Sequence, residues 1–344
     1  MRSRYVENEN GLVMHVLEAG EPGRPGVLLL HGFPELAYSW RKVMPALAAA
    51  GFHVVAPDQR GYGRTTGWDA AYDGDVHSFR LLNLVRDALG LVTALGWRSV
   101  AAVIGHDFGA AVAANCALLH PDVFRSVVLM SAPFGGPAMR DIGAELAALP
   151  RPRKHYQWYY STRAANDNMW HCAQGVHAFL RAYFHMKSAD WKGNKPFRLA
   201  GWSAAELAKM PTYYIMDLAK TMAETVAPEM PAGPAPWLGE DELAVYSAEY
   251  ARTGFQGGLQ WYRCRIEDRN GDLNDVAGRA IEVPSMFIAG ASDWGIYQVP
   301  GAFEQMQQRA LARMRGCHLV AGAGHWVQQE RSDEVTRLLL ELLA

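Results

Sequence analysis

An aspartate occupies the sharpest turn that the sequence predicts. Residues Val103–Ala110 are typical of a strand, a tight turn and a helix, with Asp107 flanked by Gly105 and Gly109. This pattern is the nucleophile elbow, which lifts one side chain above the carboxyl edge of a parallel sheet. A carboxylate at that point can attack an electrophilic carbon and form an ester. The turn alone fits an ordinary helix N-cap equally well.

An acid and a histidine follow two later strand-like runs. Asp293 comes after Pro284–Ala289, and His325 comes after Cys317–Val320. The chain order nucleophile, acid, histidine is typical of α/β-hydrolases. A histidine that acts as a general base needs its second ring nitrogen held by a carboxylate, so we expect Asp293 to orient His325. His318 lies inside its strand-like run and is interpreted as structural.

A loop with a proline follows the strand-like run Val27–Leu30. It reads His-Gly-Phe-Pro-Glu over residues 31–35. The backbone N–H of Phe33, together with that of Phe108, can form an oxyanion hole. The Phe33–Pro34 bond is predicted to be cis, because x-Pro bonds in tight turns are the usual cis bonds. The alternative is an ordinary loop between a strand and a helix.

Buried strands and the helices between them must position these residues. Continuous apolar runs predict strands that are buried on both faces, and alternation with helices predicts an α/β fold with a mostly parallel sheet. The opening segments Tyr5–Asn8 and Leu12–Leu17 predict an antiparallel hairpin. The predicted strands are Val27–Leu30, His53–Ala56, Val100–Ile104, Val127–Met130, Pro284–Ala289 and Cys317–Val320, and the predicted helices include Leu81–Leu95, Ala110–Leu119 and Val335–Leu343.

The middle of the chain predicts a helical insertion. From about Pro137 to Asp275 the strand-like runs disappear, and aromatic, methionine-rich segments with a helical character replace them. A proline-rich stretch at 228–236 divides the insertion into two helical groups. We therefore expect a sheet domain made of residues 1–136 and 276–344, with a helical cap formed by residues 137–275.

Composition excludes several classes of function. The chain has 344 residues, of which 33 are basic and 35 acidic, and the net charge of -2 argues against a nucleic-acid or membrane-surface binder. No apolar run reaches the roughly 18 residues of a membrane span. The polar start of the chain predicts no signal peptide and a cytoplasmic location. The spacing of the four cysteines does not suit a metal site, so no metal is expected.

Together these motifs resemble the epoxide hydrolases of the α/β-hydrolase fold superfamily, over almost the whole chain. His31–Pro34 matches the H-G-x-P motif of that family, Asp58–Gly63 is similar to its D-x-R-G-x-G segment, and Gly105–Gly109 matches its G-H-D-x-G elbow. The resemblance implies a mostly parallel eight-stranded sheet flanked by helices, with an inserted all-helical cap.

The resemblance also implies two tyrosines in the cap that face the nucleophile. Tyr156 in His-Tyr-Gln-Trp-Tyr matches the first, and Tyr262 in Leu-Gln-Trp-Tyr-Arg matches the second. The alternative is that both tyrosines only pack in the core of the cap, as aromatic side chains often do. If either assignment is wrong, Tyr159 and Tyr160 are the next candidates for the same role.

The implied reaction converts an epoxide and water to a vicinal diol without a cofactor. In this scheme Asp107 forms an ester with the substrate, the two cap tyrosines protonate the ring oxygen, and His325 with Asp293 activates water. The residues expected to contact substrate are His31, Pro34, Trp158, Trp261 and Trp326. The expected partner is a small-molecule epoxide, not nucleic acid or a membrane, and the expected state is a monomer or a homodimer.

Two alternatives stay open. A haloalkane or haloacid dehalogenase has the same fold and the same aspartate nucleophile, but such enzymes typically hold the halide with a tryptophan N–H or an arginine beside it. Phe108, where many relatives carry tryptophan, offers neither. The second alternative is a non-catalytic ligand-binding protein of the hydrolase fold.

Overall fold

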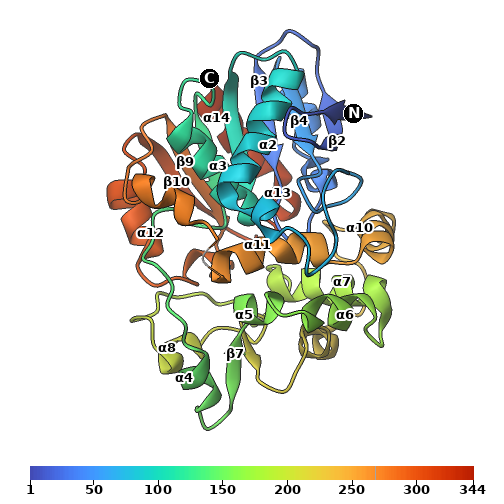
Figure 1. The fold of residues 1–344 in the computed structure, drawn as a ribbon, viewed down its shortest axis with the longest axis vertical. Helices are drawn as coiled ribbons and strands as arrows, with labels where there is room; N and C mark the ends of the chain where they lie inside the picture. The colour runs from blue at the N-terminus through green and yellow to red at the C-terminus, as the bar shows by residue number, and fades with distance from the viewer. Residues whose placement is uncertain (268) are drawn as a thin grey trace.

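An eight-stranded sheet forms the core of the computed structural model, which describes residues 1–267 and 269–344 (Figure 1). The first two pairs, β1 with β2 and β2 with β4, are antiparallel, and the other neighbours are parallel. In spatial order the strands are β1 (Arg2–Glu7), β2 (Val13–Ala19), β4 (His53–Pro57), β3 (Gly26–Leu30), β5 (Val100–His106), β6 (Val127–Met130), β9 (Ser285–Gly290) and β10 (Met314–Val320). The predicted fold class and the opening hairpin are therefore confirmed.

Helices cover both faces of this sheet. Because side chains alternate along a strand, Val27 and Leu29 of β3 belong to one apolar cluster and Leu28 and Leu30 to another. The first cluster includes residues of α1 and α14, and the second includes residues of α2 and α3. The elements of this part are η1 (Ala37–Trp40), α1 (Met44–Ala49), η2 (Val76–Phe79), α2 (Leu81–Ala94), α3 (Phe108–Leu119), η5 (Trp294–Ile296), α12 (Ala302–Gln305), η6 (Met306–Ala310), α13 (Val327–Glu330) and α14 (Ser332–Leu343).

The insertion between β6 and β9 is helical except for one small ribbon. Two three-residue strands, β7 (Arg153–His155) and β8 (Ile215–Asp217), pair in antiparallel fashion. The other elements are α4 (Gly143–Ala147), α5 (Tyr156–Tyr160), α6 (Ala164–Trp170), α7 (Gly175–Lys187), α8 (Ala204–Leu207), α9 (Met222–Val226), η3 (Ala227–Glu229), α10 (Glu240–Thr253), α11 (Gln256–Ile266) and η4 (Gly271–Val276).

The expectation of an all-helical cap is therefore wrong at this ribbon. The sequence analysis assigned the segment around Ile215 to a helix because it is rich in aromatic residues and methionine. Its strand character comes from pairing with His155, sixty residues earlier, and three residues are too few to show a strand periodicity. The boundaries at 137 and 275 stay a prediction, and Asp268 lies outside the described residues.

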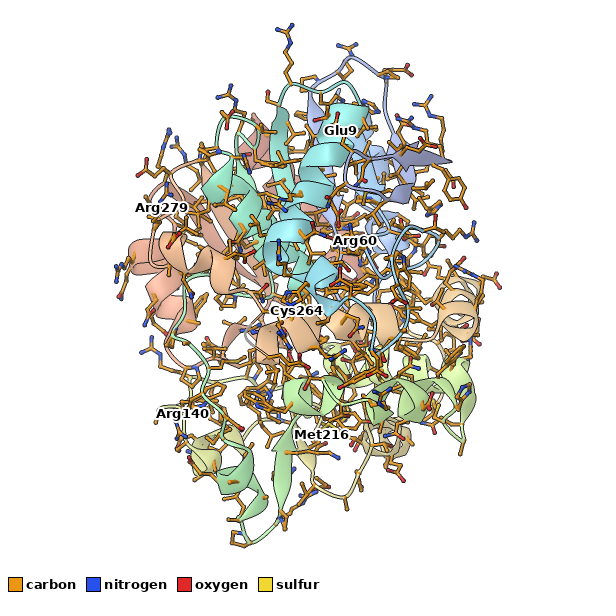
Figure 2. The ribbon with its side chains drawn as sticks, in the orientation of Figure 1. Glu9, Arg60, Arg140, Met216, Cys264 and Arg279 are labelled. Atoms are coloured by element: carbon orange, nitrogen blue, oxygen red, sulfur yellow. The ribbon has the colours of Figure 1, made fainter. Side chains whose placement is uncertain are left out.

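The cap lies across the end of the sheet domain, with α11 at the boundary (Figure 1). Side chains fill the space between the two parts, with Arg60 on the sheet side and Met216 in the cap (Figure 2). Phe33 packs edge-on against Tyr262 of α11, with ring centroids 5.5 Å apart. One apolar cluster thus joins cap and sheet domain. No helix in the described part of the chain is long and apolar enough to cross a membrane.

Candidate active site

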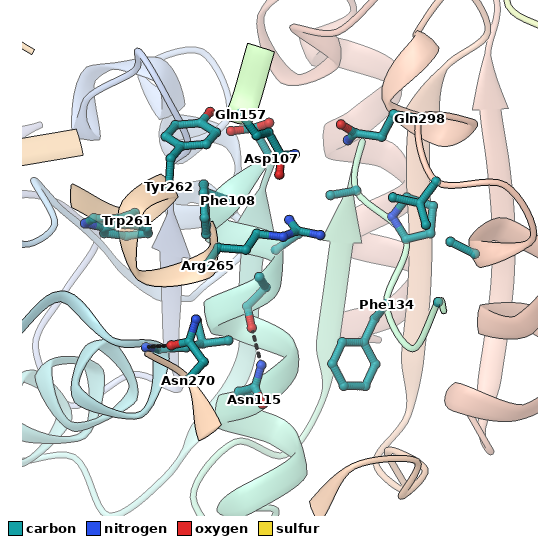
Figure 3. A pocket seen from close by; sticks show the side chains of 18 of the residues that line it. Asp107, Phe108, Asn115, Phe134, Gln157, Trp261, Tyr262, Arg265, Asn270 and Gln298 are labelled. Atoms are coloured by element: carbon teal, nitrogen blue, oxygen red, sulfur yellow. Dashed lines mark hydrogen bonds between the residues drawn. The ribbon is translucent and has the colours of Figure 1, made fainter. Parts of the chain in front are cut away.

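Asp107 sits on a strained turn between β5 and α3. Its φ of 51° and ψ of -119° are unusual for a residue with a side chain. The turn needs glycines on both sides, because a Cβ on Gly105 would lie 2.1 Å from the Gly109 carbonyl oxygen. The Asp107 side chain is directed to the cavity between sheet domain and cap (Figure 3). The elbow predicted from the sequence is therefore present in the structure.

The histidine and the second aspartate lie beside this carboxylate. His325 follows β10 and Asp293 follows β9, so both lie at the carboxyl edge of the sheet. The His325 Nδ1 atom is 3.2 Å and 3.3 Å from the two Asp293 carboxylate oxygens. Its Nε2 atom is 3.5 Å from Asp107 Oδ2 and forms no hydrogen bond with any described residue. The arrangement leaves Nε2 free to take a proton from a water molecule.

A backbone N–H group of the loop after β3 contacts the same carboxylate. The N–H of Phe33 donates to Asp107 Oδ1 at 3.1 Å. Phe108 is the first residue of α3, where an N–H has no partner within the helix. A Cβ on Gly32 would lie 2.4 Å from the Asp107 Cβ, so only glycine permits this approach. The Phe33–Pro34 bond is cis, as predicted.

The two predicted cap tyrosines line the cavity that contains Asp107. Tyr156 begins α5 and Tyr262 lies on α11, and their ring centroids are 6.0 Å apart. The Tyr156 hydroxyl donates to Gln298 Oε1 at 3.0 Å and accepts from Gln157 Nε2 at 3.0 Å. The fallback candidates Tyr159 and Tyr160 do not line this cavity.

The charges of the site favour an ionised nucleophile and neutral phenols. Burial opposes ionisation of Asp107, but the adjacent His325 ring and the charge of Lys187 hold its pKa well below the usual value. Burial also opposes ionisation of Asp293, and contacts with His325 lower its pKa. Burial, reinforced by the charge of Asp107, raises the pKa of Tyr156 and of Tyr262. Both phenols therefore keep their protons at neutral pH.

The cavity has a volume of about 280 Å³, and its lining corrects the predicted substrate contacts. Of the five residues expected to touch substrate, only Trp261 lines it (Figure 3). The side chain of His31 is fully buried and bonded to the Gly32 carbonyl and the Gln59 N–H.

The other three residues expected to contact substrate do not line the cavity either. Trp326 is fully buried and donates to the Phe184 carbonyl at 2.8 Å. Trp158 packs edge-on against His155 instead of the cavity. Pro34 is buried in its turn and does not line the cavity. All three lie near the reacting residues in sequence, but their side chains pack into the protein.

The cavity residues that the sequence analysis missed include Gln157, Gln298 and Arg265. Gln157 and Gln298 contact the Tyr156 hydroxyl, and Arg265 lines the cavity wall. Arg265 is three residues after Tyr262, so helical spacing was a usable signal for it. Gln298 lies in a loop with no local pattern, and no signal in the sequence marks it.

Comparison with known proteins agrees with this geometry. Residues 25–332 match the model of the alpha/beta hydrolase fold family. Epoxide hydrolase A of Mycobacterium tuberculosis is 39% identical over 97% of this chain and 95% of its own length, and an epoxide hydrolase of Caballeronia sordidicola is 32% identical over 97% and 91%. A solved epoxide hydrolase from an endophytic Streptomyces superposes with a TM-score of 0.82 at 34% identity, covering 99% of this chain and 95% of that one. The chain belongs to the α/β-hydrolase fold family and, within it, to the epoxide hydrolases.

Proposed function

We propose that the protein hydrolyses epoxides to vicinal diols through a covalent ester on Asp107. The observation that carries this proposal is the placement of an ionised carboxylate and two protonated phenols on one cavity. An epoxide is an sp³ electrophile with a poor alkoxide leaving group, so ring opening needs both a nucleophile and a proton donor.

Ring opening is the first step. An Asp107 carboxylate oxygen attacks one ring carbon, the bond from that carbon to the ring oxygen breaks, and the oxygen takes a proton from Tyr156 or Tyr262. The second phenol donates a hydrogen bond to the same oxygen and stabilises the developing charge. The products are a hydroxyalkyl ester of Asp107 and a phenolate, which regains its proton from solvent.

Ester hydrolysis is the second step. His325 Nε2 takes a proton from water as the water oxygen attacks the Asp107 ester carbon, and Asp293 stabilises the resulting imidazolium. The N–H groups of Phe33 and Phe108 hold the tetrahedral oxyanion. Collapse of this intermediate breaks the ester bond, the imidazolium protonates the departing diol, and Asp107 is regenerated with one oxygen from water.

The dehalogenase alternative has less support from the cavity. Trp261 is the one tryptophan among the described residues that line it, and its indole N–H already donates to the Arg60 carbonyl at 2.9 Å. That N–H is therefore not free to hold a halide beside Asp107. The relatives reported above carry the name epoxide hydrolase.

Parallel assays of diol and halide release test the proposal. Purified protein is offered an aryl epoxide and a haloalkane of similar size, with Asp107→Asn as the matched inactive control. We expect diol from the epoxide, no halide, and no product from the variant. Halide release without diol would support the dehalogenase, and no product from either would support the binding protein. The cytoplasmic location and the monomer or homodimer also stay predictions.

A further inference from the structure

An arginine of the cap projects into the cavity that contains Asp107. Arg265 lies on α11 three residues after Tyr262, so the two side chains leave the helix on neighbouring positions of one face. Arg265 lines the cavity and points into it (Figure 3). Neither ring opening nor ester hydrolysis, as derived above, uses this charge.

The Arg265 guanidinium has few partners of its own. Its Nη2 atom contacts the Met139 sulfur at 3.7 Å, and a thioether is a weak acceptor. Within residues 1–267 and 269–344, no carboxylate forms an ion pair with it. An arginine carries five N–H donors in a planar fork, and the described residues leave most of those of Arg265 available to a group in the cavity.

A second hollow adjoins the cavity and is also lined by arginine side chains. It has a volume of about 480 Å³, shares Asn115 and Phe134 with the cavity, and is lined by Arg279 and Arg309. Arg279 lies on the sheet-domain side of the molecule (Figure 2). Among the described residues that line the two hollows, Asp107 is the only acid. Because the whole chain has a net charge of -2, this excess of positive charge is local.

The rest of the cavity suits the alkyl or aryl part of a ligand. Ala111 and Asn115 line it four and eight residues after Asp107, so it follows one face of α3 for roughly 12 Å. Phe79 and Leu84 contribute apolar side chains to the same wall. A ligand with an alkyl or aryl part and one negative group would match both the walls and the charge.

We infer that the preferred substrates are epoxides that carry a carboxylate, and that Arg265 binds this carboxylate while the ring lies between Asp107 and the cap tyrosines. The inference rests on the proposed epoxide hydrolysis. The planar guanidinium matches a carboxylate with two parallel hydrogen bonds. Arg279 and Arg309 attract the anion towards the cavity from the adjoining hollow. Arg265 is thus a specificity-determining residue.

Matched acid and amide substrates test this assignment. Terminal epoxy alkanoic acids with short, medium and long chains are each compared with the neutral primary amide of the same chain. We expect wild-type kcat/KM to favour the acid of the best-fitting length by roughly tenfold to hundredfold, as for a charged hydrogen-bonded pair. Arg265→Gln should lose this preference while its kcat/KM on the amide stays within about threefold.

Two further variants separate recognition of charge from damage to the fold. Arg265→Met must lose the acid preference in the same way, and Arg265→Lys must retain part of it. Arg24→Gln removes an exposed arginine from the loop before β3 and should keep the wild-type preference.

Equal use of acid and amide by the wild type would overturn the inference, as would an equal loss on both substrates in Arg265→Gln. Failure of the proposed function gives a different result, because then the wild type forms no diol from any acid or amide.

Discussion

The sheet domain and the cap position their residues in the cavity by different physical means. Asp107, Asp293 and His325 each follow a strand, and backbone turns determine where their side chains lie. Tyr156 and Tyr262 come from helices of the cap and are positioned by side-chain packing. The Tyr156 hydroxyl is also hydrogen-bonded to Gln298 and Gln157. Single changes of the sheet-domain residues should therefore remove a chemical step, whereas single changes in the cap should slow ring opening or alter selectivity.

The largest effect should come from Asp107→Asn. The amide cannot form the ester, so we expect kcat to fall by at least roughly 10⁴-fold, as for removal of a nucleophile in other hydrolases. Diol formation with an aryl epoxide measures this, and an unchanged melting temperature shows that the fold survives. A variant that forms diol at a tenth of the wild-type rate would show that Asp107 is not the nucleophile.

His325→Gln should separate the two steps. Ring opening does not use the imidazole as a base, whereas ester hydrolysis does, so the variant should gain the mass of one substrate and then stall. Intact-protein mass spectrometry detects the adduct, and steady-state turnover should fall by roughly 10³–10⁴-fold. The absence of any adduct after long exposure to a substrate of the wild type would contradict the two-step scheme.

In the cap, Tyr156→Phe and Tyr262→Phe should each slow ring opening by roughly 10²–10⁴-fold, the usual contribution of a general acid. The double variant should nearly abolish it. Tyr159→Phe is the matched control, since that residue does not line the cavity. Single-turnover rates of ester formation measure this effect. A double variant with the wild-type rate would show that neither phenol protonates the ring oxygen.

A smaller effect is expected from Gln298→Leu. This change removes the Gln298 Oε1 acceptor to which the Tyr156 hydroxyl donates. A neutral hydrogen bond contributes about 0.5–1.5 kcal/mol, so ring opening should slow by up to roughly tenfold. The effect should disappear when Tyr156 is already phenylalanine. Equal losses in the presence and absence of the phenol would assign Gln298 another role.

The smallest change concerns the pH dependence of ring opening. Because His325 lowers the pKa of Asp107, its carboxylate should stay ionised in the wild type below about pH 3.9, the usual value for an aspartate. Without His325, less opposes the effect of burial, which raises the pKa of Asp107. The rate of ester formation in His325→Gln should therefore begin to fall at a higher pH than in the wild type. Adduct formation measured against pH in both proteins tests the direction, and a fall at the same pH in both would contradict it.

The sequence analysis was most successful where a local pattern dictates the backbone. The glycines around Asp107 and the apolar run of each central strand predicted the elbow and the parallel sheet. Helical segments at Leu81 and in the final helix were also placed within a few residues. These features depend on steric rules that act over a few neighbouring residues.

Prediction failed where distant segments decide the structure. The β7–β8 ribbon pairs residues about sixty apart, and its short strands show no periodicity. Trp326 was expected to contact substrate, yet its indole lies in the protein interior. Gln298 meets Tyr156 across 142 residues of chain, and no local pattern reports such a contact. The direction of these side chains thus needed the three-dimensional structure.

In the covalent mechanism, Asp107 gives one of its own oxygens to the diol. A single turnover of excess wild-type protein in water labelled with heavy oxygen tests this step, with the product and the peptide that contains Asp107 both analysed by mass spectrometry. We expect an unlabelled diol and one heavy oxygen on Asp107, because water attacks the ester carbon and not the substrate. A labelled diol with an unlabelled Asp107 would show that the carboxylate only activates water, and would contradict the covalent mechanism.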